Sequence, residues 1–99
     1  MEKFVYYGEI FNIYKGLLSK NIQEIFSYYF EDNLTLQEIA ENLGVSKSYV
    51  GNVIKMSEKK LDDLESNLHI YENSQKLNVA LEKDSIDEIK QIIRNILEK

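Results

Sequence analysis

The sequence of 99 residues has no cysteine, no proline and no tryptophan, and it has a single histidine. Without cysteine the chain can form neither a disulfide framework nor a thiolate metal site. His69 has no periodically spaced carboxylate beside it, so we predict no metal site and interpret it as an ordinary surface or interface residue. The absence of proline favours long, uninterrupted helices.

Signal sequences, membrane spans and catalytic motifs are also missing. The N-terminus lacks the basic-then-apolar order of a signal peptide, and no apolar run approaches the length of a membrane span. There is no glycine-rich phosphate loop, and the carboxylates of Glu31 and Asp32 have no histidine near them for acid–base catalysis. We therefore predict a cytoplasmic protein that does not insert into membranes, is not an enzyme and needs no cofactor.

Basic residues are fewer than acidic ones: the chain has 12 lysines and arginines and 17 acidic residues, and its net charge is −5. This balance argues against indiscriminate binding of nucleic acid, which depends on positive charge. The positive charge is, however, concentrated. Residues 46–60 carry a net charge of +3, which leaves −8 for the rest of the chain. The charge alone is equally compatible with a solvated helix face and with a contact surface for phosphates.

The segment from residue 36 to residue 53 has the pattern of a helix-turn-helix. Thr35 and Glu38 form a capping box that starts a helix. Gly44 ends this helix, because a residue without a Cβ accepts a left-handed backbone, and Ser46 caps the next helix. A plain helical corner of an ordinary bundle is the alternative. The side chains expected to pack in this tight corner are Leu36, Ile39, Ala40, Leu43, Val45, Val50, Val53 and Ile54.

Two amphipathic helices are predicted before this motif. The first covers residues 3–18, and Tyr6 lies off its apolar stripe and is expected to be exposed. The second covers residues 20–30 and is capped by Ser19. Their aromatic rings favour packing in a core over stacking with single-stranded bases. The predicted core positions are Phe4, Tyr7, Ile10, Phe11, Tyr14, Leu17 and Leu18, followed by Ile22, Ile25, Phe26 and Tyr29.

The second helix of the motif is predicted to continue to about Asn67, well beyond a minimal motif. Its apolar residues have nearly heptad spacing, interrupted only by Ser57, with Glu65 among the charged residues on the outside. A helix of this length needs a partner, either a further helix or a second copy of the chain. We predict a joint at residues 71–75, between this long helix and the rest of the chain. The predicted seam consists of Val50, Ile54, Leu61, Leu64, Leu68 and Tyr71.

The last helix is predicted to begin at a second capping box, formed by Ser85 and Glu88. Its aliphatic residues make one broad apolar face, consisting of Ile86, Ile89, Ile92, Ile93, Ile96 and Leu97. This is too much apolar surface for a terminal helix to leave in water. We expect the helix to pack on the long helix or across a dimer interface.

The basic segment coincides with the part of the motif that meets nucleic acid. In a helix-turn-helix the second helix enters the major groove with its N-terminal turns. Lys47 suits guanine and Asn52 suits adenine. Thr35 and Gln37, at the start of the preceding helix, are positioned to touch the backbone. The residues assigned to phosphate contacts are Ser46, Ser48, Lys55 and Lys59.

Two stretches around the motif are distinctive. One runs from Leu17 through Tyr29-Phe30-Glu31-Asp32 into Leu36-x-Glu38-Ile39-Ala40, and the other is the helix that ends in Leu68-His69-x-Tyr71. With these stretches, residues 11–77 resemble the YlxM-like family of small bacterial helix-turn-helix proteins. That family is related to the sigma-factor domain that binds the upstream promoter element. The head alone is shared with many regulators, whereas the head with this arm is much more specific.

The resemblance implies an all-α fold with a head similar to region 4 of sigma factors, a long recognition helix and a C-terminal helical arm. We expect the head to comprise residues 1–66, with the helix-turn-helix at residues 35–56, and the arm to comprise residues 67–99 and to form a homodimer. The resemblance also implies action with the signal recognition particle pathway, since the family's genes lie beside those of the particle's GTPases. A role as a DNA-binding regulator is inferred from the fold.

Several residues of the motif depart from the family pattern. Lys47-Ser48-Tyr49 stands where relatives usually carry Arg-Gln-Ala, and lysine lacks the planar fork with which arginine makes bidentate base contacts. Met56 stands where a basic residue is frequent. Gly51 lies inside the recognition helix, which costs about 1 kcal/mol relative to alanine, and it can bring the helix closer to a partner.

Two functions are compatible with this sequence. The first is a nucleic-acid-binding accessory or regulatory protein of the signal recognition particle pathway, which inserts the helix starting at Ser46 into a groove of DNA or of the particle's RNA. The alternative is a protein–protein interaction module of the secretion pathway that binds no nucleic acid and offers its acidic arm to a basic partner. Salt dependence distinguishes them, because phosphate contacts weaken steeply with salt.

Overall fold

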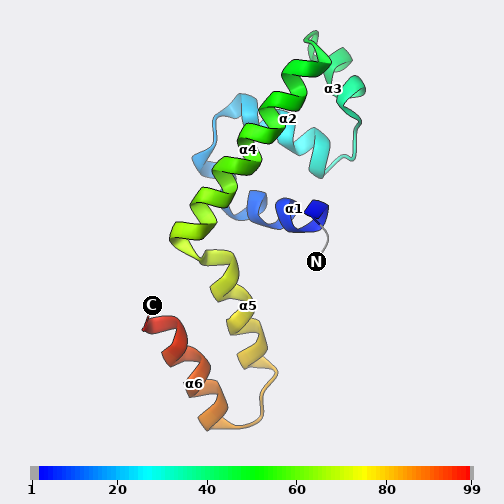
Figure 1. Ribbon diagram of the computed structural model, residues 1–99. Coiled ribbons are helices and arrows are strands. Elements are labelled where there is room, and N and C mark those ends of the chain that lie inside the picture. Colours follow the sequence, from blue (N-terminus) through cyan, green and yellow to red (C-terminus); the bar gives the residue numbers. More distant parts are fainter. Residues whose placement is uncertain (1–2, 99) are drawn as a thin grey trace.

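The computed structural model describes residues 3–98, which fold entirely into helices and turns (Figure 1). The molecule is elongated, with extents of 56 × 22 × 19 Å. No helix within the described range is both long and apolar enough to cross a membrane. The elements are α1 (Lys3–Tyr14), the 3-10 turn η1 (Lys15–Leu17), α2 (Lys20–Phe30), α3 (Leu36–Leu43), α4 (Lys47–Leu68), α5 (Ile70–Leu81) and α6 (Ile86–Leu97). The predicted all-α helix-turn-helix fold is confirmed.

The boundary of α2 agrees with the sequence prediction, whereas α1 ends earlier than predicted. Ser19 Oγ accepts a hydrogen bond from Ile22 N at 3.3 Å, as expected for an N-cap. Helix α1 ends at Tyr14, and the tighter η1 turn rotates the chain before α2 begins. Leu18 is therefore buried, while Leu17 is 59% exposed and the prediction that it belongs to the core was wrong.

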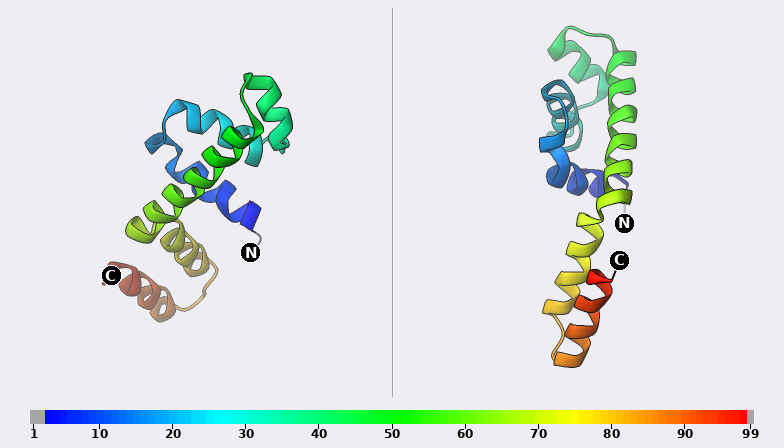
Figure 2. Two further views of the ribbon diagram at one scale, coloured as in Figure 1. Left: turned by 45° about the horizontal axis from the view of Figure 1, so that its top comes forward. Right: turned by 90° about the vertical axis from the view of Figure 1, so that its left-hand side faces the viewer.

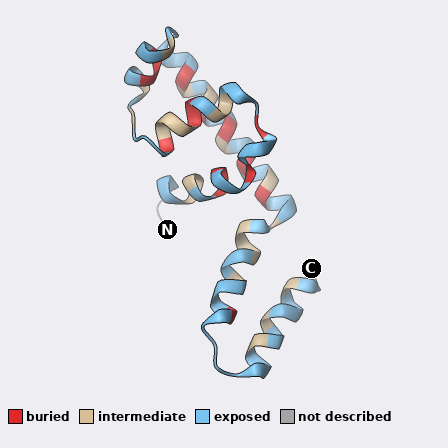
Figure 3. Ribbon diagram, turned by 180° about the vertical axis from the view of Figure 1, so that it is seen from behind, coloured by how far each residue is buried: buried red, intermediate tan, exposed pale blue. Residues whose placement is uncertain are grey.

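The core lies in the head, where α1, α2 and α3 pack against α4 (Figure 3). Aromatic rings fill its centre, with ring centroids 4.7 Å apart for Phe11 and Phe26 and 4.3 Å apart for Phe26 and Phe30. Tyr6 is half-buried, and its ring contacts Tyr7 and Tyr71 at centroid distances of 5.3 and 5.4 Å. The prediction of an exposed Tyr6 was wrong because the start of α5 packs against α1 and brings the Tyr71 ring against Tyr6.

Helix α4 is the long helix predicted from the sequence. Its 22 residues span about 33 Å, from the far end of the head to the arm. Ser57 does not interrupt the seam, because its hydroxyl donates to Val53 O at 2.6 Å and the side chain is buried. Leu68 is 48% exposed and lies outside the seam, contrary to the prediction. The buried face of α4 consists of Val50, Ile54, Ser57, Leu61 and Glu65.

Glu65 is buried, so the prediction that it lies on the outside of α4 was wrong. Its Oε1 accepts hydrogen bonds from the Tyr14 hydroxyl at 2.6 Å and from Tyr71 N at 3.0 Å. Its Oε2 accepts from Glu72 N at 2.9 Å. The N–H groups at the start of a helix have no partner within that helix, and a carboxylate there is favoured by the helix dipole. Glu65 therefore caps α5 and links it to α1 and α4.

The joint between head and arm lies at His69, not at residues 71–75. His69 has a left-handed backbone with φ 55°, which ends α4 and begins α5 in one residue. Its Nδ1 lies 3.1 Å from Glu72 Oε2, which fastens the joint to the first turn of α5. The predicted joint is wrong because its residues continue a regular helix once Glu65 caps α5. The division into domains at residues 66 and 67 stays a prediction.

The arm is a hairpin in which α6 runs back along α5 (Figure 2). Ser85 Oγ accepts from Glu88 N at 3.4 Å, so the Ser85 half of the predicted capping box forms, whereas Glu88 Oε2 lies 3.8 Å from Lys83 Nζ. The alternatives predicted for α6 were the long helix and a dimer interface, but within residues 3–98 its principal contact is α5. None of its described residues is buried, and Ile86 and Leu97 are 68% and 77% exposed. Much of its apolar face is therefore open to solvent.

Candidate nucleic-acid interface

The corner between α3 and α4 forms as the sequence predicts. Thr35 Oγ1 accepts from Glu38 N at 3.1 Å, and Glu38 Oε1 accepts from Thr35 N at 2.9 Å, which completes the capping box. These bonds hold the pKa of Glu38 below its usual value. Gly44 is left-handed with φ 67°, and Val45 N donates to Ala40 O at 3.0 Å.

The interior of this corner is tightly closed, and one side chain predicted inside it lies outside. Ile39 and Val50 are fully buried and Ala40 is 4% exposed, so the two helices cross closely where the small side chain stands. Val45 is 38% exposed, and the prediction that it packs under the helices was wrong. The turn is too short to bring Val45 back inside, because Ser46 already caps α4 by accepting from Tyr49 N at 3.0 Å.

All six residues predicted to bind nucleic acid are exposed; Ser46 is the N-cap of α4, and the other five lie between Lys47 and Lys59 of this helix. Ser48, Asn52, Lys55 and Lys59 are separated by three or four positions and thus share one helix face. Helix α4 runs along one side of the head, with α1, α2 and α3 on the other side (Figure 2). Four of the six residues also border a shallow depression of about 320 Å³, whose lining is Leu36, Lys47, Ser48, Gly51, Asn52 and Lys55.

Three acidic side chains of α4, those of Glu58, Asp62 and Glu65, have partners on α1. Glu58 Oε1 lies 3.7 Å from Lys3 Nζ. The hydroxyl of Tyr7 donates to Asp62 Oδ2 at 2.8 Å, as that of Tyr14 does to Glu65. Helix α1 thus contacts three carboxylates of α4 at successive turns. The basic side chains at the other end of α4 remain directed to solvent.

Burial keeps these tyrosines protonated. Burial and, after it, the hydrogen bond to Glu65 raise the pKa of Tyr14 to about 12. Burial and the bond to Asp62 raise the pKa of Tyr7 as well. Both hydroxyls therefore remain donors at neutral pH. Sequence reasoning missed these pairs, although the seven-residue spacing of the tyrosines places them on one face of α1.

A further contact that the sequence analysis missed holds the start of α4. Asn21 Nδ2 donates to the Tyr49 hydroxyl at 2.8 Å, which connects the first turn of α2 to the first turn of α4. The contact requires the Tyr49 hydroxyl as the acceptor. The two residues are far apart in the sequence, and no periodic pattern signals their contact.

Comparisons with known proteins cover both head and arm. A family model described as "Putative helix-turn-helix protein, YlxM / p13 like" matches residues 1–98. A UPF0122 protein of Mycoplasma mycoides is 36% identical over 102 aligned residues, covering 99% of this chain and 88% of the relative. One from Fusobacterium nucleatum is 35% identical, with 98% of both chains covered. One from Limosilactobacillus reuteri is 37% identical over 79% of this chain and 69% of its own.

Proposed function

The chain belongs to the UPF0122 family of YlxM/p13-like helix-turn-helix proteins, and on this premise we propose that it binds nucleic acid through the N-terminal half of α4 and acts as a regulatory or accessory protein. One observation carries the proposal. Four of the six predicted residues, Lys47, Ser48, Asn52 and Lys55, border a single depression that is open to solvent. Positive charge and hydrogen-bonding groups thus converge at the end of the helix that enters a groove in this motif.

The side chains divide into two roles. Lys47 and Asn52 lie at the depression and are proposed to contact base edges. Ser46, Ser48, Lys55 and Lys59 are proposed to contact phosphates and to set the orientation of the helix. The capped N-terminus of α3 supports this arrangement, since Leu36 forms part of the same depression. A phosphate near this terminus would meet backbone N–H groups.

The pathway proposed for this protein is that of the signal recognition particle. The resemblance associates the family with the signal recognition particle, so the ligand is either DNA or the particle's RNA. The test is a titration of the purified protein against duplex DNA, the particle's RNA and the particle's protein subunit, at low and at physiological salt. We expect binding to one polymer with a steep salt dependence, whose slope corresponds to roughly three or four phosphate contacts.

Either of two results would contradict this expectation. Binding that does not change with salt would exclude phosphate contacts by the lysines. Binding of the protein subunit alone would favour the second candidate function, a protein–protein interaction module. That candidate is supported by the net charge of −5 and by the exposed apolar face of the arm.

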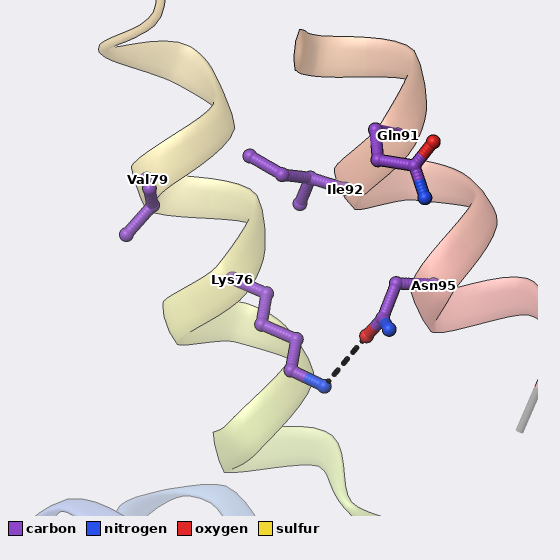
Figure 4. A pocket seen from close by; sticks show the side chains of 5 residues that line it. All are labelled: Lys76, Val79, Gln91, Ile92 and Asn95. Atoms are coloured by element: carbon purple, nitrogen blue, oxygen red, sulfur yellow. Dashed lines mark hydrogen bonds between the residues drawn. The ribbon is translucent and has the colours of Figure 1, made fainter.

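The arm is proposed to form a homodimer. Between α5 and α6 lies a groove of about 350 Å³, lined by Lys76, Val79, Gln91, Ile92 and Asn95 (Figure 4). Lys76 Nζ donates to Asn95 Oδ1 at 3.0 Å across it. Beside it, Leu77, Leu81 and several aliphatic residues of α6 remain exposed. A second copy of the hairpin would cover this surface and complete a four-helix arrangement.

Truncation tests this assignment. We expect a chain that ends before Ser85 to be monomeric by light scattering, while the full chain is dimeric, because the truncation removes the apolar face of α6. Retained helicity of residues 3–81 by circular dichroism would be the control for folding. A truncated chain with the mass of a dimer would place the interface elsewhere, for example on α4.

A further inference from the structure

Gly51 lies inside the recognition helix, although neither the backbone nor the packing requires glycine there. It occupies the second turn of α4, where glycine is among the least favourable residues. Its φ is not positive, in contrast to Gly44. A Cβ at this position would lie 3.8 Å from Leu36 Cδ1, which is an ordinary van der Waals distance, and would meet no other atom within 4 Å. An alanine would therefore fit and would favour the helix.

The missing side chain leaves space in the depression. Gly51 and Leu36 both line it, and both also line a second hollow of about 190 Å³ whose lining includes Tyr29 and Ile54. We refer to the space over Gly51 and Leu36 as the Gly51 notch. Its floor is apolar and offers no side-chain donor or acceptor. Asn52, the next residue of α4, lies beside it.

The surroundings restrict what could enter the notch. Lys47 and Lys55 border the depression, and residues 46–60 carry +3 on a chain of −5, which favours a polyanion. The floor favours a small apolar projection from that polyanion. Among the base-pair edges in the major groove of DNA, the 5-methyl group of thymine is the apolar one. The adenine paired with that thymine presents N6 and N7, which match an asparagine amide.

We propose that the Gly51 notch receives the 5-methyl group of a thymine while Asn52 contacts an adenine beside it, so that the ligand is duplex DNA containing an A·T pair. Because Gly51 and Asn52 are adjacent on α4, the contacts fall on the same base pair or on neighbouring pairs. Double-stranded RNA lacks the methyl group, and its major groove is too deep and narrow for side chains to reach the bases. The inference rests on the proposed function and specifies its ligand.

The test removes the methyl group and leaves the rest of the ligand unchanged. Duplexes of about 20 base pairs, or two helical turns, would be selected for binding from a random pool. They would then be resynthesised with deoxyuridine in place of every thymidine. We expect the wild-type protein to bind the uracil duplex about fourfold more weakly for each contacted methyl group. A duplex RNA of the same sequence is expected to bind more weakly than both.

The variant Gly51→Ala fills the notch and serves as the second half of the experiment. We expect it to lose the preference for thymine and to bind the selected duplex more weakly. Its melting temperature is expected to rise by roughly 4–8 °C, since alanine favours the helix and no neighbour is displaced. Gly8→Ala in α1 is the matched control, because a Cβ there meets no atom within 4 Å. That control is expected to gain stability and keep the thymine preference.

The outcomes separate the inference from the proposed function. Equal, salt-sensitive binding of thymine and uracil duplexes overturns the notch and leaves nucleic-acid binding by α4 intact. A Gly51→Ala variant that keeps the thymine preference overturns the notch as well, and so does equally tight binding of duplex RNA. Failure of the selection to yield any salt-sensitive DNA duplex overturns the notch, and it refutes the proposed function itself if the particle's RNA also shows no salt-sensitive binding.

Discussion

Replacing Lys47 and Lys55 together by glutamate is expected to reduce nucleic-acid binding on the order of a hundredfold or more, without loss of helix content. Both side chains are exposed at the depression on α4, so neither contributes to the core. The double variant removes two proposed contacts and places two negative charges beside a polyanion. Each lost phosphate contact also lowers the dependence of log K on log salt by about 0.9. Fluorescence anisotropy at several salt concentrations measures both effects.

The matched control reverses two exposed lysines elsewhere. Lys15→Glu with Lys90→Glu gives the same net charge, with one change in η1 and the other in α6. We expect this control to bind with much smaller losses, because general repulsion falls off within a Debye length of about 8–10 Å in salt. Equal losses in the two double variants would show that net charge, not the interface on α4, governs binding. Undiminished binding by Lys47→Glu with Lys55→Glu would refute the interface.

The largest loss of stability is expected for Glu65→Ala. The substitution leaves the buried Tyr14 hydroxyl without its acceptor and removes the partners of Tyr71 N and Glu72 N at the start of α5. Losing hydrogen bonds to a charged acceptor at a site that is 8% exposed should lower the free energy of unfolding by roughly 3 kcal/mol. The melting temperature should fall by roughly 12–24 °C, measured by circular dichroism.

Asp63→Ala provides the comparison, because Asp63 is an exposed carboxylate on the same helix. Its effect is expected to stay within about 0.5 kcal/mol, the range of ordinary surface substitutions. Tyr14→Phe should lie between the two, since it removes one donor and leaves the cap on α5 in place. If Glu65→Ala melts at the wild-type temperature, the carboxylate does not hold the joint between head and arm.

The Glu65 cap also bears on function, because it fixes the direction of the arm relative to α4. Head and arm are joined by a single residue, the left-handed His69, which by itself would leave their relative orientation poorly fixed. The carboxylate binds α1 and α5 at the same time and so orders both sides of the joint. In a dimer formed by the arms, the separation of the two recognition helices would depend on this contact.

The helix-turn-helix was predictable because its signals are local. The capping box at Thr35, the stop at Gly44 and the cap at Ser46 each depend on residues three or four positions apart, and the structure places all three as predicted. The candidate site was predictable for the same reason. Exposure on one helix face follows from helical periodicity, and its residues lie within 14 consecutive positions, from Ser46 to Lys59.

The sequence by itself thus determined α2, α3 and α4, their N-caps and the charged face of α4, since each of these depends on neighbours along the chain. The tertiary structure decided the rest. Glu65 appears polar and outward by composition, yet its partner Tyr14 is 51 positions away, and only the folding of α1 across α4 brings them together. The contacts that Glu65 makes in this packing also place the break between α4 and α5 at His69, not at residues 71–75. The notch over Gly51 exists because Leu36 of α3 completes it, and hydrophobic periodicity along one helix carries no information about a surface shared by two.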